Sequence, residues 1–429
     1  ELAAQNANFT KLTTAPWSFE IEWKNTGAGH YLNRQDRAWA LDWIFDKLME
    51  NRVYCQFNFM VHVVLEPGGP YGWEENPYNI NNGGPSHEPQ NFFVNTTSKS
   101  LYKRKMRYIN ARWGYSPYLH SWEILSEADN TGLYDAFYWQ TYDWLTEMSE
   151  YIKDIDRYNR PVSSGYAIPQ HDPNYWNHQG TDFTQLHLYD FIPDLEMKIY
   201  SFSRWYGQTY GKPFITGEFA LGHVPEIIQE MDPEGIAFHN SLWTSAFSGA
   251  FGTAMSWWWG NYLYPGGMFS FFNPIGTFFE ETGINPHDYE IDVPHATSST
   301  NGILEIRPDY NNANSKAPDN HFVVHPGGYM SPPEIRLGEV LHGSVSSSNK
   351  NPPTFHVNFT KPGTFKVRTD DLVLFANLRI KLNGTTVLDQ SATANHTYSI
   401  SVPAGEHQIY VQNTGFGVME IDKYTFGNY

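Results

Sequence analysis

Cysteine and basic residues are scarce in this chain, and it contains no long apolar run. Cys55 is the single cysteine among 429 residues, so no disulfide can form within the chain. Lys and Arg number 28 against 46 Asp and Glu, and the formal net charge of −18 repels phosphate backbones. No apolar run approaches the roughly 18 residues of a membrane span. The sequence therefore predicts neither nucleic-acid binding nor a membrane span. It also lacks clustered residues at metal-ligand spacing, so we expect no metal and no cofactor.

Aromatic residues are abundant by contrast. Phe, Trp and Tyr make up 17% of the chain, including 15 Trp. Carbohydrate-binding clefts use aromatic faces as platforms for sugar rings, although the packing of an aromatic-rich core accounts for part of the excess. The composition favours a carbohydrate as partner.

The chain also carries features of an exported protein. The acceptor triplet N-x-[ST] occurs at Asn8, Asn95, Asn358, Asn383 and Asn395, close to the number expected by chance. The sequence begins at Glu1 without an initiator Met or a signal peptide, which is typical of a processed or partial chain. We expect an extracellular or cell-surface glycoprotein.

Strand-like and helix-like segments alternate from about residue 17 to residue 280, the pattern of a parallel α/β architecture. The expected strands are Val53–Leu65, Leu119–Leu125, Val162–Ser164, Phe183–Leu188, Phe214–Glu218 and Thr253–Trp259. Helices are expected at Asp36–Glu50 and Asp135–Ile155, and another is expected to begin at Asp232. These elements predict a (β/α)8 TIM barrel over residues 1–285. Ser18–Trp23 supplies one further strand, so strand 1 is expected to be missing from this chain. An upstream fragment or self-assembly would then cover the open strand edges.

The remaining residues have a different pattern. Residues 286–335 are rich in Pro, Asn, Ser and Gly and read as a connecting segment with one or two strands. Residues 336–429 alternate strictly in stretches such as Thr354–Phe359, and Asn383-Gly384 is a hairpin signal. We expect an all-β, jelly-roll-like sandwich there. It is either a carbohydrate-binding module or a structural module that braces the barrel.

Two carboxylates stand at the ends of expected strands. Glu127 follows Ser121–Ser126, and Glu218 follows Phe214–Gly217. The carboxyl ends of the strands are where an α/β barrel keeps its catalytic groups, and glycoside hydrolysis needs two such groups. We predict Glu127 as acid/base and Glu218 as nucleophile. The alternative is that each is an ordinary barrel-mouth residue in a salt bridge.

Several motifs in residues 20–280 are shared with a known family. They are the two Glu motifs, the His-x-Tyr of Gln185–Tyr189, the Trp triplet at 257–259, and Ala111–Pro117 followed by Trp122-Glu123. In order and spacing they resemble clan A glycoside hydrolases, of which family 5 cellulases and mannanases are typical. The resemblance implies that His187 and Tyr189 form the strand-six pair and that the Tyr hydroxyl holds the nucleophile. It also implies a cleft role for His62 and a Trp floor, for which strand alternation favours Trp257 or Trp259. Glu22 is a further candidate for substrate contact.

Two positions depart from the family pattern. Ser126 stands directly before Glu127, where the clan has Asn in contact with the sugar 2-hydroxyl; Ser cannot offer the same donor and acceptor. The clan's strand-two Arg, which supports the nucleophile, has no match in Arg34 or Arg37 and is expected upstream.

The sequence therefore predicts a secreted retaining hydrolase of β-linked polysaccharide. The alternative is a non-catalytic structural or carbohydrate-binding surface protein that keeps the hydrolase fold, and transglycosylation would use the same residues. Three structural expectations follow. The two carboxyls lie less than about 7 Å apart, a donor or cation contacts Glu218, and the barrel has a gap beside the strand at 53–65.

Overall fold

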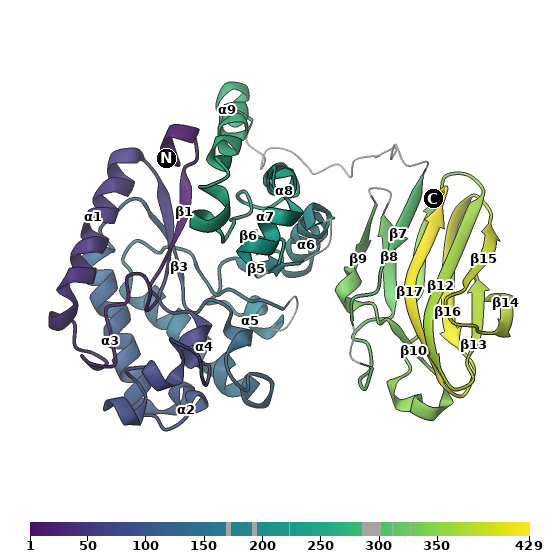
Figure 1. Cartoon of the computed structure of the whole chain (residues 1–429), viewed down its shortest axis with the longest axis horizontal. Coiled ribbons are helices and arrows are strands. Elements are labelled where there is room, and N and C mark those ends of the chain that lie inside the picture. The colour runs from purple at the N-terminus through teal and green to yellow at the C-terminus, as the bar shows by residue number, and fades with distance from the viewer. Residues whose placement is uncertain (169–172, 191–194, 223, 285–301, 311–312, 326–327) are drawn as a thin grey trace. The chain divides into compact units, whose positions relative to one another are not determined.

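The chain divides into two compact units, residues 1–289 and 290–429, which are described separately (Figure 1). The computed structural model describes residues 1–168, 173–190, 195–222, 224–284, 302–310, 313–325 and 328–429. No helix within these residues is long and apolar enough to cross a membrane.

The first unit is built on parallel strands with helices between them. One sheet has the order β1-β2-β3-β4, and β5 pairs with β6 in a second parallel sheet. The strands are β1 (Phe9–Thr13), β2 (Tyr54–Asn58), β3 (Leu119–Glu123), β4 (Val162–Ser163), β5 (Thr184–Tyr189) and β6 (Phe214–Ala220). A parallel bridge from Tyr166 to Leu186 links the two sheets, and another joins Phe219 to Ser256. Among the described residues these pairings form a parallel series from β1 to residue 256, but they do not close it into a barrel.

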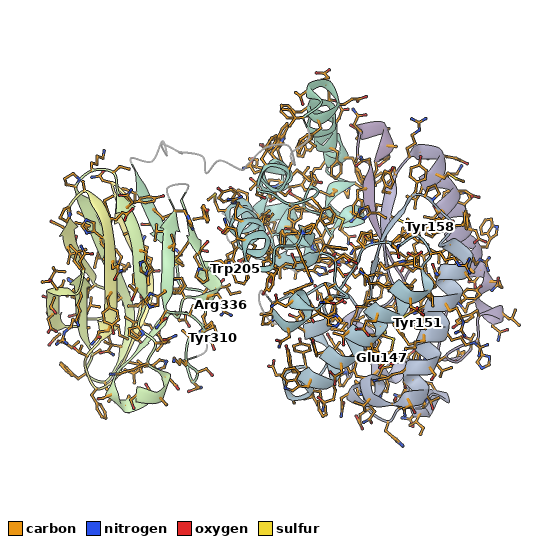
Figure 2. The ribbon with its side chains drawn as sticks, turned by 180° about the vertical axis from the view of Figure 1, so that it is seen from behind. Glu147, Tyr151, Tyr158, Trp205, Tyr310 and Arg336 are labelled. Carbon is orange, nitrogen blue, oxygen red and sulfur yellow. The ribbon has the colours of Figure 1, made fainter. Side chains whose placement is uncertain are left out.

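The helices lie between and outside these strands (Figure 1). They are α1 (Gln35–Asn51), α2 (Pro89–Val94), α3 (Thr96–Trp113), α4 (Tyr138–Ile155), α5 (Pro173–Asn177), α6 (Leu195–Tyr210), α7 (Pro225–Met231), α8 (Ile236–Phe247) and α9 (Phe272–Thr282). Charged contacts join α3 to α4: Glu147 accepts from Lys99 at 2.7 Å and from Lys103 at 2.6 Å (Figure 2). The helix expected at Asp232 begins at Ile236, because the Asp232 carboxylate accepts the backbone N–H groups of residues 236–238.

The strand expected in the first 30 residues was placed wrongly. Residues 18–19 form a turn, and the strand that pairs with β2 is β1 instead. The Ser18 hydroxyl donates to the Thr13 carbonyl at 2.6 Å, and Pro16 lies between these two residues, so the chain turns away from the sheet there. The misplacement matters because β1 carries a residue of the site.

The expected gap is also in a different place. β2 pairs on both sides, with β1 and β3, so no gap adjoins the strand at 53–65. β1 lies at the end of the sheet order, and a cavity of about 950 Å³ separates it from residues 250–256. Phe9, Thr10, Ala254 and Ile275 are among the side chains that line this cavity.

The second unit consists of two mainly antiparallel sheets. One has the order β10-β17-β12-β15 with β7 paired to β17, and the other has the order β14-β13-β16-β11-β8-β9. The strands are β7 (Ile303–Ile306), β8 (His321–His325), β9 (Tyr329–Ser331), β10 (Val340–His342), β11 (Thr354–Phe359), β12 (Gly363–Val373), β13 (Asn377–Leu382), β14 (Thr385–Ser391), β15 (Thr397–Val402), β16 (Gly405–Asn413) and β17 (Val418–Gly427). Phe355 of one sheet and Phe365 of the other belong to the same buried core.

This arrangement differs from the expected connecting segment at 286–335. Residues 285–301 lie outside the described part of the chain, but residues 303–331 hold β7, β8 and β9, which pair within the two sheets. One or two strands were expected here, but their place in the two sheets was not, because Pro, Asn and Gly surround each of them and the partners β17 of β7 and β11 of β8 lie far along the sequence.

Candidate active site

Most of the predicted site residues surround one cavity of about 520 Å³ in the first unit. Its lining includes His62, Ser126, Glu127, Tyr189, Glu218 and Trp257. His187 is fully buried against both Glu side chains. Segments far apart in the sequence, the ends of β3, β5 and β6, therefore bring these side chains together.

Two predicted residues lie elsewhere. Trp259 lines the cavity beside β1 and not this one. Strand-like pairing ends near Ser256 and a π-helix begins at Trp259, so the alternation that placed Trp257 and Trp259 on one face does not continue. Glu22 is 1% exposed and faces a separate small cavity with Lys105.

Glu127 is held in a conformation that is unusual for its residue type. Backbone hydrogen bonds fix the residues on either side of Glu127. The Ser126 N–H donates to the Met60 carbonyl at 2.9 Å, and the Ala128 N–H donates to the Gly165 carbonyl at 3.0 Å. Between them Glu127 adopts a left-handed backbone with φ of 55°. Such strain persists where the surroundings enforce it, and it is concentrated at functional sites.

Three side chains contact the Glu127 carboxylate. His187 Nδ1 lies 2.9 Å from Oε1, while Asn130 Nδ2 donates to Oε2 at 2.8 Å and His62 Nδ1 lies 3.3 Å from Oε2. Burial alone raises the pKa of Glu127, but the hydrogen bond and charge of His187, aided by His62 and Asn130, outweigh it and lower this pKa to about 2. The ionised form of this carboxyl group is therefore favoured at neutral pH.

Glu218 is contacted by a hydroxyl and by a cation. Tyr189 donates its hydroxyl to Oε2 at 2.7 Å, and Lys11 Nζ lies 2.9 Å from Oε1. A register shift between Leu186 and His187 in the pairing of β5 with β6 sets His187 opposite Glu218. Gly217 permits this fit, because a Cβ there would lie 2.6 Å from the Gln185 side chain.

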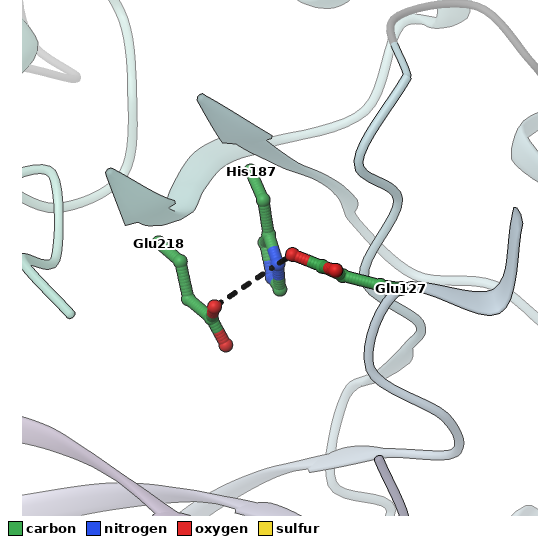
Figure 3. Close-up of side chains that lie close together, drawn as sticks. All are labelled: Glu127, His187 and Glu218. Atoms are coloured by element: carbon green, nitrogen blue, oxygen red, sulfur yellow. Dashed lines mark hydrogen bonds and ion pairs between the residues drawn. The ribbon is translucent and has the colours of Figure 1, made fainter. Parts of the chain in front are cut away.

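His187 lies between the two carboxylates, as Figure 3 shows. Its Nδ1 is 2.9 Å from Glu127 and 3.3 Å from Glu218, and the three ligand-type atoms all lie within 4.8 Å of one another. Burial lowers the pKa of His187, yet the negative charges of Glu218 and Glu127 raise it overall. The imidazole thus lies between two carboxylates whose charges favour its protonated form.

Lys11 and Glu123 belong to this site and were missed in the sequence. Lys11 Nζ bridges Glu218 and Glu123, at 2.8 Å from Glu123 Oε2, and Glu123 also accepts from Gln185 at 2.7 Å. Burial lowers the pKa of Lys11, but Glu123 and Glu218 raise it overall. The stretch Phe9–Thr13 does not alternate, since two polar residues separate Phe9 from Leu12, so its local pattern did not indicate a strand. Lys11 thus supplies a cation to Glu218 from within the chain, whereas the supporting Arg was expected upstream of it.

Trp17 is a further residue that the sequence did not single out. It lines the cavity with 46% of its surface exposed, and its ring centroid lies 5.3 Å from that of Tyr71. Together with Trp257 and Trp258 on the opposite element, it gives the cavity aromatic faces.

Glu127, His187 and Glu218 are spaced closely enough to hold a metal ion. A cation is already supplied to them, since the Lys11 ammonium contacts Glu218 and the raised pKa of His187 favours the imidazolium. A metal would have to displace the imidazole proton and compete with the lysine, so the donor set suits proton chemistry better than metal binding.

The chain was compared with known proteins. No protein-family model and no curated protein matches it. Among solved structures it is similar to an endo-β-1,4-mannanase from Thermotoga petrophila, with a TM-score of 0.46 and 13% identity over 98% of this chain and 92% of that chain. It is also similar to a putative glycoside hydrolase from Bacteroides vulgatus, with a TM-score of 0.44 and 13% identity over 96% and 74% of the two chains. An endo-1,4-beta-mannanase from Rhizomucor miehei gives a TM-score of 0.40 and 17% identity over 54% and 76%. At these scores the likeness carries no argument about activity, which has to rest on the site.

Proposed function

We propose that this chain is a retaining glycoside hydrolase that cleaves a β-linked polysaccharide. The observation that carries the proposal is the pair of buried carboxylates, Glu127 and Glu218, with oxygens within 4.8 Å across one cavity. Retention requires carboxyl groups about 5–5.5 Å apart, whereas inversion needs about 6.5–9.5 Å to admit a water molecule. The spacing supports double displacement.

The two carboxylates are in environments that suit different roles. Glu218 is contacted by Lys11 and by the Tyr189 hydroxyl and is placed to attack the anomeric carbon. Glu127 receives no cation from lysine but contacts the imidazole of His187, whose Nδ1 lies 2.9 Å from Oε1. We expect a sugar that fills the cavity to remove water from Glu127, which favours its neutral form and a proton on the carboxyl group, with His187 as the neighbouring proton carrier.

The reaction then proceeds in two steps. Glu218 forms an ester bond to the anomeric carbon while the glycosidic C–O bond breaks, and Glu127 gives its proton to the leaving oxygen. Glu127, now a carboxylate, takes a proton from water; the resulting hydroxide attacks the anomeric carbon and Glu218 leaves as a carboxylate. Atoms and charge balance over the two steps, and neither a metal nor a cofactor is required.

The test is hydrolysis of soluble β-glucans, mannans and xylans by the native chain and by Glu218→Gln. We expect products from the native chain alone, with the anomeric configuration of the substrate in the first product seen by NMR. A 2-fluoro glycoside should add one sugar mass to the peptide that contains Glu218. Product of inverted configuration would contradict retention, and no turnover of any glycan by a folded chain would contradict the hydrolase.

A non-catalytic carbohydrate-binding protein with the same fold is the second candidate. Two observations favour it: the pKa of Glu127 is lowered to about 2, and Ser126 stands where an amide would contact the sugar. Binding of a glycan without turnover, unchanged in Glu218→Gln, is the result that would select it. Transglycosylation would instead appear as products longer than the substrate.

We also propose an extracellular location, since a polymeric glycan is met outside the cell. The acceptor triplet at Asn95 is a poor site for glycosylation in the folded chain. Its side chain caps α3 by accepting from the Thr97 and Ser98 N–H groups, and its Nδ2 donates to the Pro85 carbonyl at 2.8 Å.

A further inference from the structure

The second unit has a cavity of its own, separate from the catalytic pair. It measures about 310 Å³, at the lower end of the roughly 300–1,000 Å³ typical of small-molecule sites. Its walls come from β10, from the loop at residues 350–352 and from β16. The site is therefore formed by three segments that the fold of this unit brings together.

An aromatic ring forms one wall of this cavity. Strand alternation puts Tyr410 and Gln412 of β16 on the same face, and both are half-buried lining residues. The ammonium group of Lys381 lies 5.7 Å from the centroid of the Tyr410 ring and covers part of it. A half-buried tyrosine with a neighbouring cation offers both a stacking face and a hydroxyl.

Polar side chains around the ring have hydrogen-bonding capacity to spare. Within the described residues, Gln412 and Lys350 make no side-chain hydrogen bond or ion pair, although both line the cavity. Asn351 uses Nδ2 to donate to the Ala317 carbonyl at 2.7 Å, which leaves its Oδ1 as an acceptor. Donors and acceptors of this kind match the neighbouring hydroxyls of a sugar ring.

The charge of the cavity is opposite to that of the chain. The chain has a formal net charge of −18, yet the lining contains Lys350 and no Asp or Glu. A neutral ligand leaves this ammonium without a counter-charge, whereas a carboxylate on the ligand pairs with it. We propose that this cavity binds a uronic acid residue of a glycan: the ring stacks on Tyr410, the carboxylate pairs with Lys350, and hydroxyls bond to Gln412 and Asn351.

The proposal does not depend on hydrolysis, and its test uses the full chain with Glu218→Gln to prevent cleavage. Affinity electrophoresis through gels that contain polygalacturonate, glucuronoxylan or neutral glucomannan measures retention directly. We expect retardation by one or both of the acidic glycans, and a dissociation constant about tenfold higher for Tyr410→Ala and for Lys350→Gln. Because the chain is strongly acidic, non-specific binding to a polyanion is disfavoured.

Lys361→Gln is the matched control, since Lys361 is an exposed lysine of the same unit that lies outside the cavity lining. The gels that contain acidic glycan should retard Lys361→Gln as much as they retard the parent chain, Glu218→Gln. Equal retardation of Tyr410→Ala and the parent, or no retardation by either acidic glycan, overturns the proposal. Retardation by glucomannan alone overturns the assignment to an acidic sugar. Circular dichroism shows that each variant is folded before it is scored.

Discussion

Lys11 carries the charge that balances two buried carboxylates beside the candidate active-site cavity. It bridges Glu218, the proposed nucleophile, and Glu123, which is fully buried. Removing one partner of a buried ion pair leaves an uncompensated charge and costs about 3–5 kcal/mol. A substitution of Lys11 is therefore expected to affect turnover through Glu218 and folding stability through Glu123, and the two effects can be measured separately.

We expect Lys11→Met to lower kcat by at least about 100-fold, the size of effect seen when a preorganised electrostatic contact is removed. Its unfolding free energy should fall by about 3 kcal/mol, because Glu123 stays buried without its cation. Lys11→Arg keeps the charge and should retain more of both. Turnover and urea unfolding measure the two effects.

The control is Lys24→Met, since Lys24 pairs with Glu75 at the surface, where such pairs contribute little. It should leave both quantities nearly unchanged. Equal losses in Lys11→Met and Lys11→Arg would show that the side-chain shape matters and the charge does not.

Glu22, which proved to lie outside the site, makes stability depend on pH. Burial raises its pKa from 4.5 to about 7, and the nearby charge of Lys105 does not cancel this. The folded chain therefore holds a proton that the unfolded chain releases. The stabilisation is complete below pH 4.5 and is lost as the pH rises through 7, a total of about 3 kcal/mol.

The variant Glu22→Gln tests this, because the amide stays neutral at every pH. Between pH 5 and pH 8 the native chain should lose about 3 kcal/mol of unfolding free energy relative to the variant. Urea unfolding at the two pH values gives the difference. An identical pH dependence in both chains would show that Glu22 is ionised in the folded state.

Among the strands, β1 differs from its neighbours by having one open edge. Tyr54 N–H donates to the Asn8 carbonyl and Thr14 N–H to that of Asn58. By the alternation of a parallel ladder, Thr10 and Leu12 face β2, whereas Phe9 and Lys11 direct their N–H groups toward the cavity beside residues 250–256.

We therefore expect the amides of Phe9 and Lys11 to exchange with deuterium faster than those of Thr10 and Leu12, since only the latter pair donate to β2. NMR-detected hydrogen exchange resolves the four amides. Equal protection of all four would mean that another segment or chain fills the cavity and pairs with β1. Dilution series would then show whether the protection requires a second copy.

In the chain as a whole, each of the two units has its own buried side chains. Phe355 is 0% exposed in the core of the second unit, and Trp122 is 0% exposed in the first. A core of its own permits a unit to fold on its own. We expect two transitions in calorimetry of the full chain.

Phe355→Ala should lower the midpoint of one transition and Trp122→Ala that of the other, because truncation of a buried aromatic side chain costs about 3–5 kcal/mol. Each variant is the control for its counterpart. If either substitution shifts both transitions by the same amount, the units unfold as one.

The sequence alone was sufficient for features that depend on neighbouring residues. Apolar runs with helical segments between them predicted the strands that became β2 to β6, and the alternation after residue 336 predicted strands of the second unit such as β11, β13, β15 and β16. Glu127 and Glu218 could be singled out because each ends such a run, and both line one cavity. The local pattern is enough to predict a buried strand, because the apolar residues that become buried belong to the strand itself.

Only the tertiary structure could decide which distant residues meet. Lys11 reaches Glu218 because β1 pairs with β2 in one particular register, and His187 lies between the carboxylates because of a register shift within the pairing of β5 and β6. The π-helix at Trp259 moved that side chain to another cavity. Register, bulges and irregular turns are set by contacts between segments far apart in the chain. No single stretch of sequence contains both partners of such a contact.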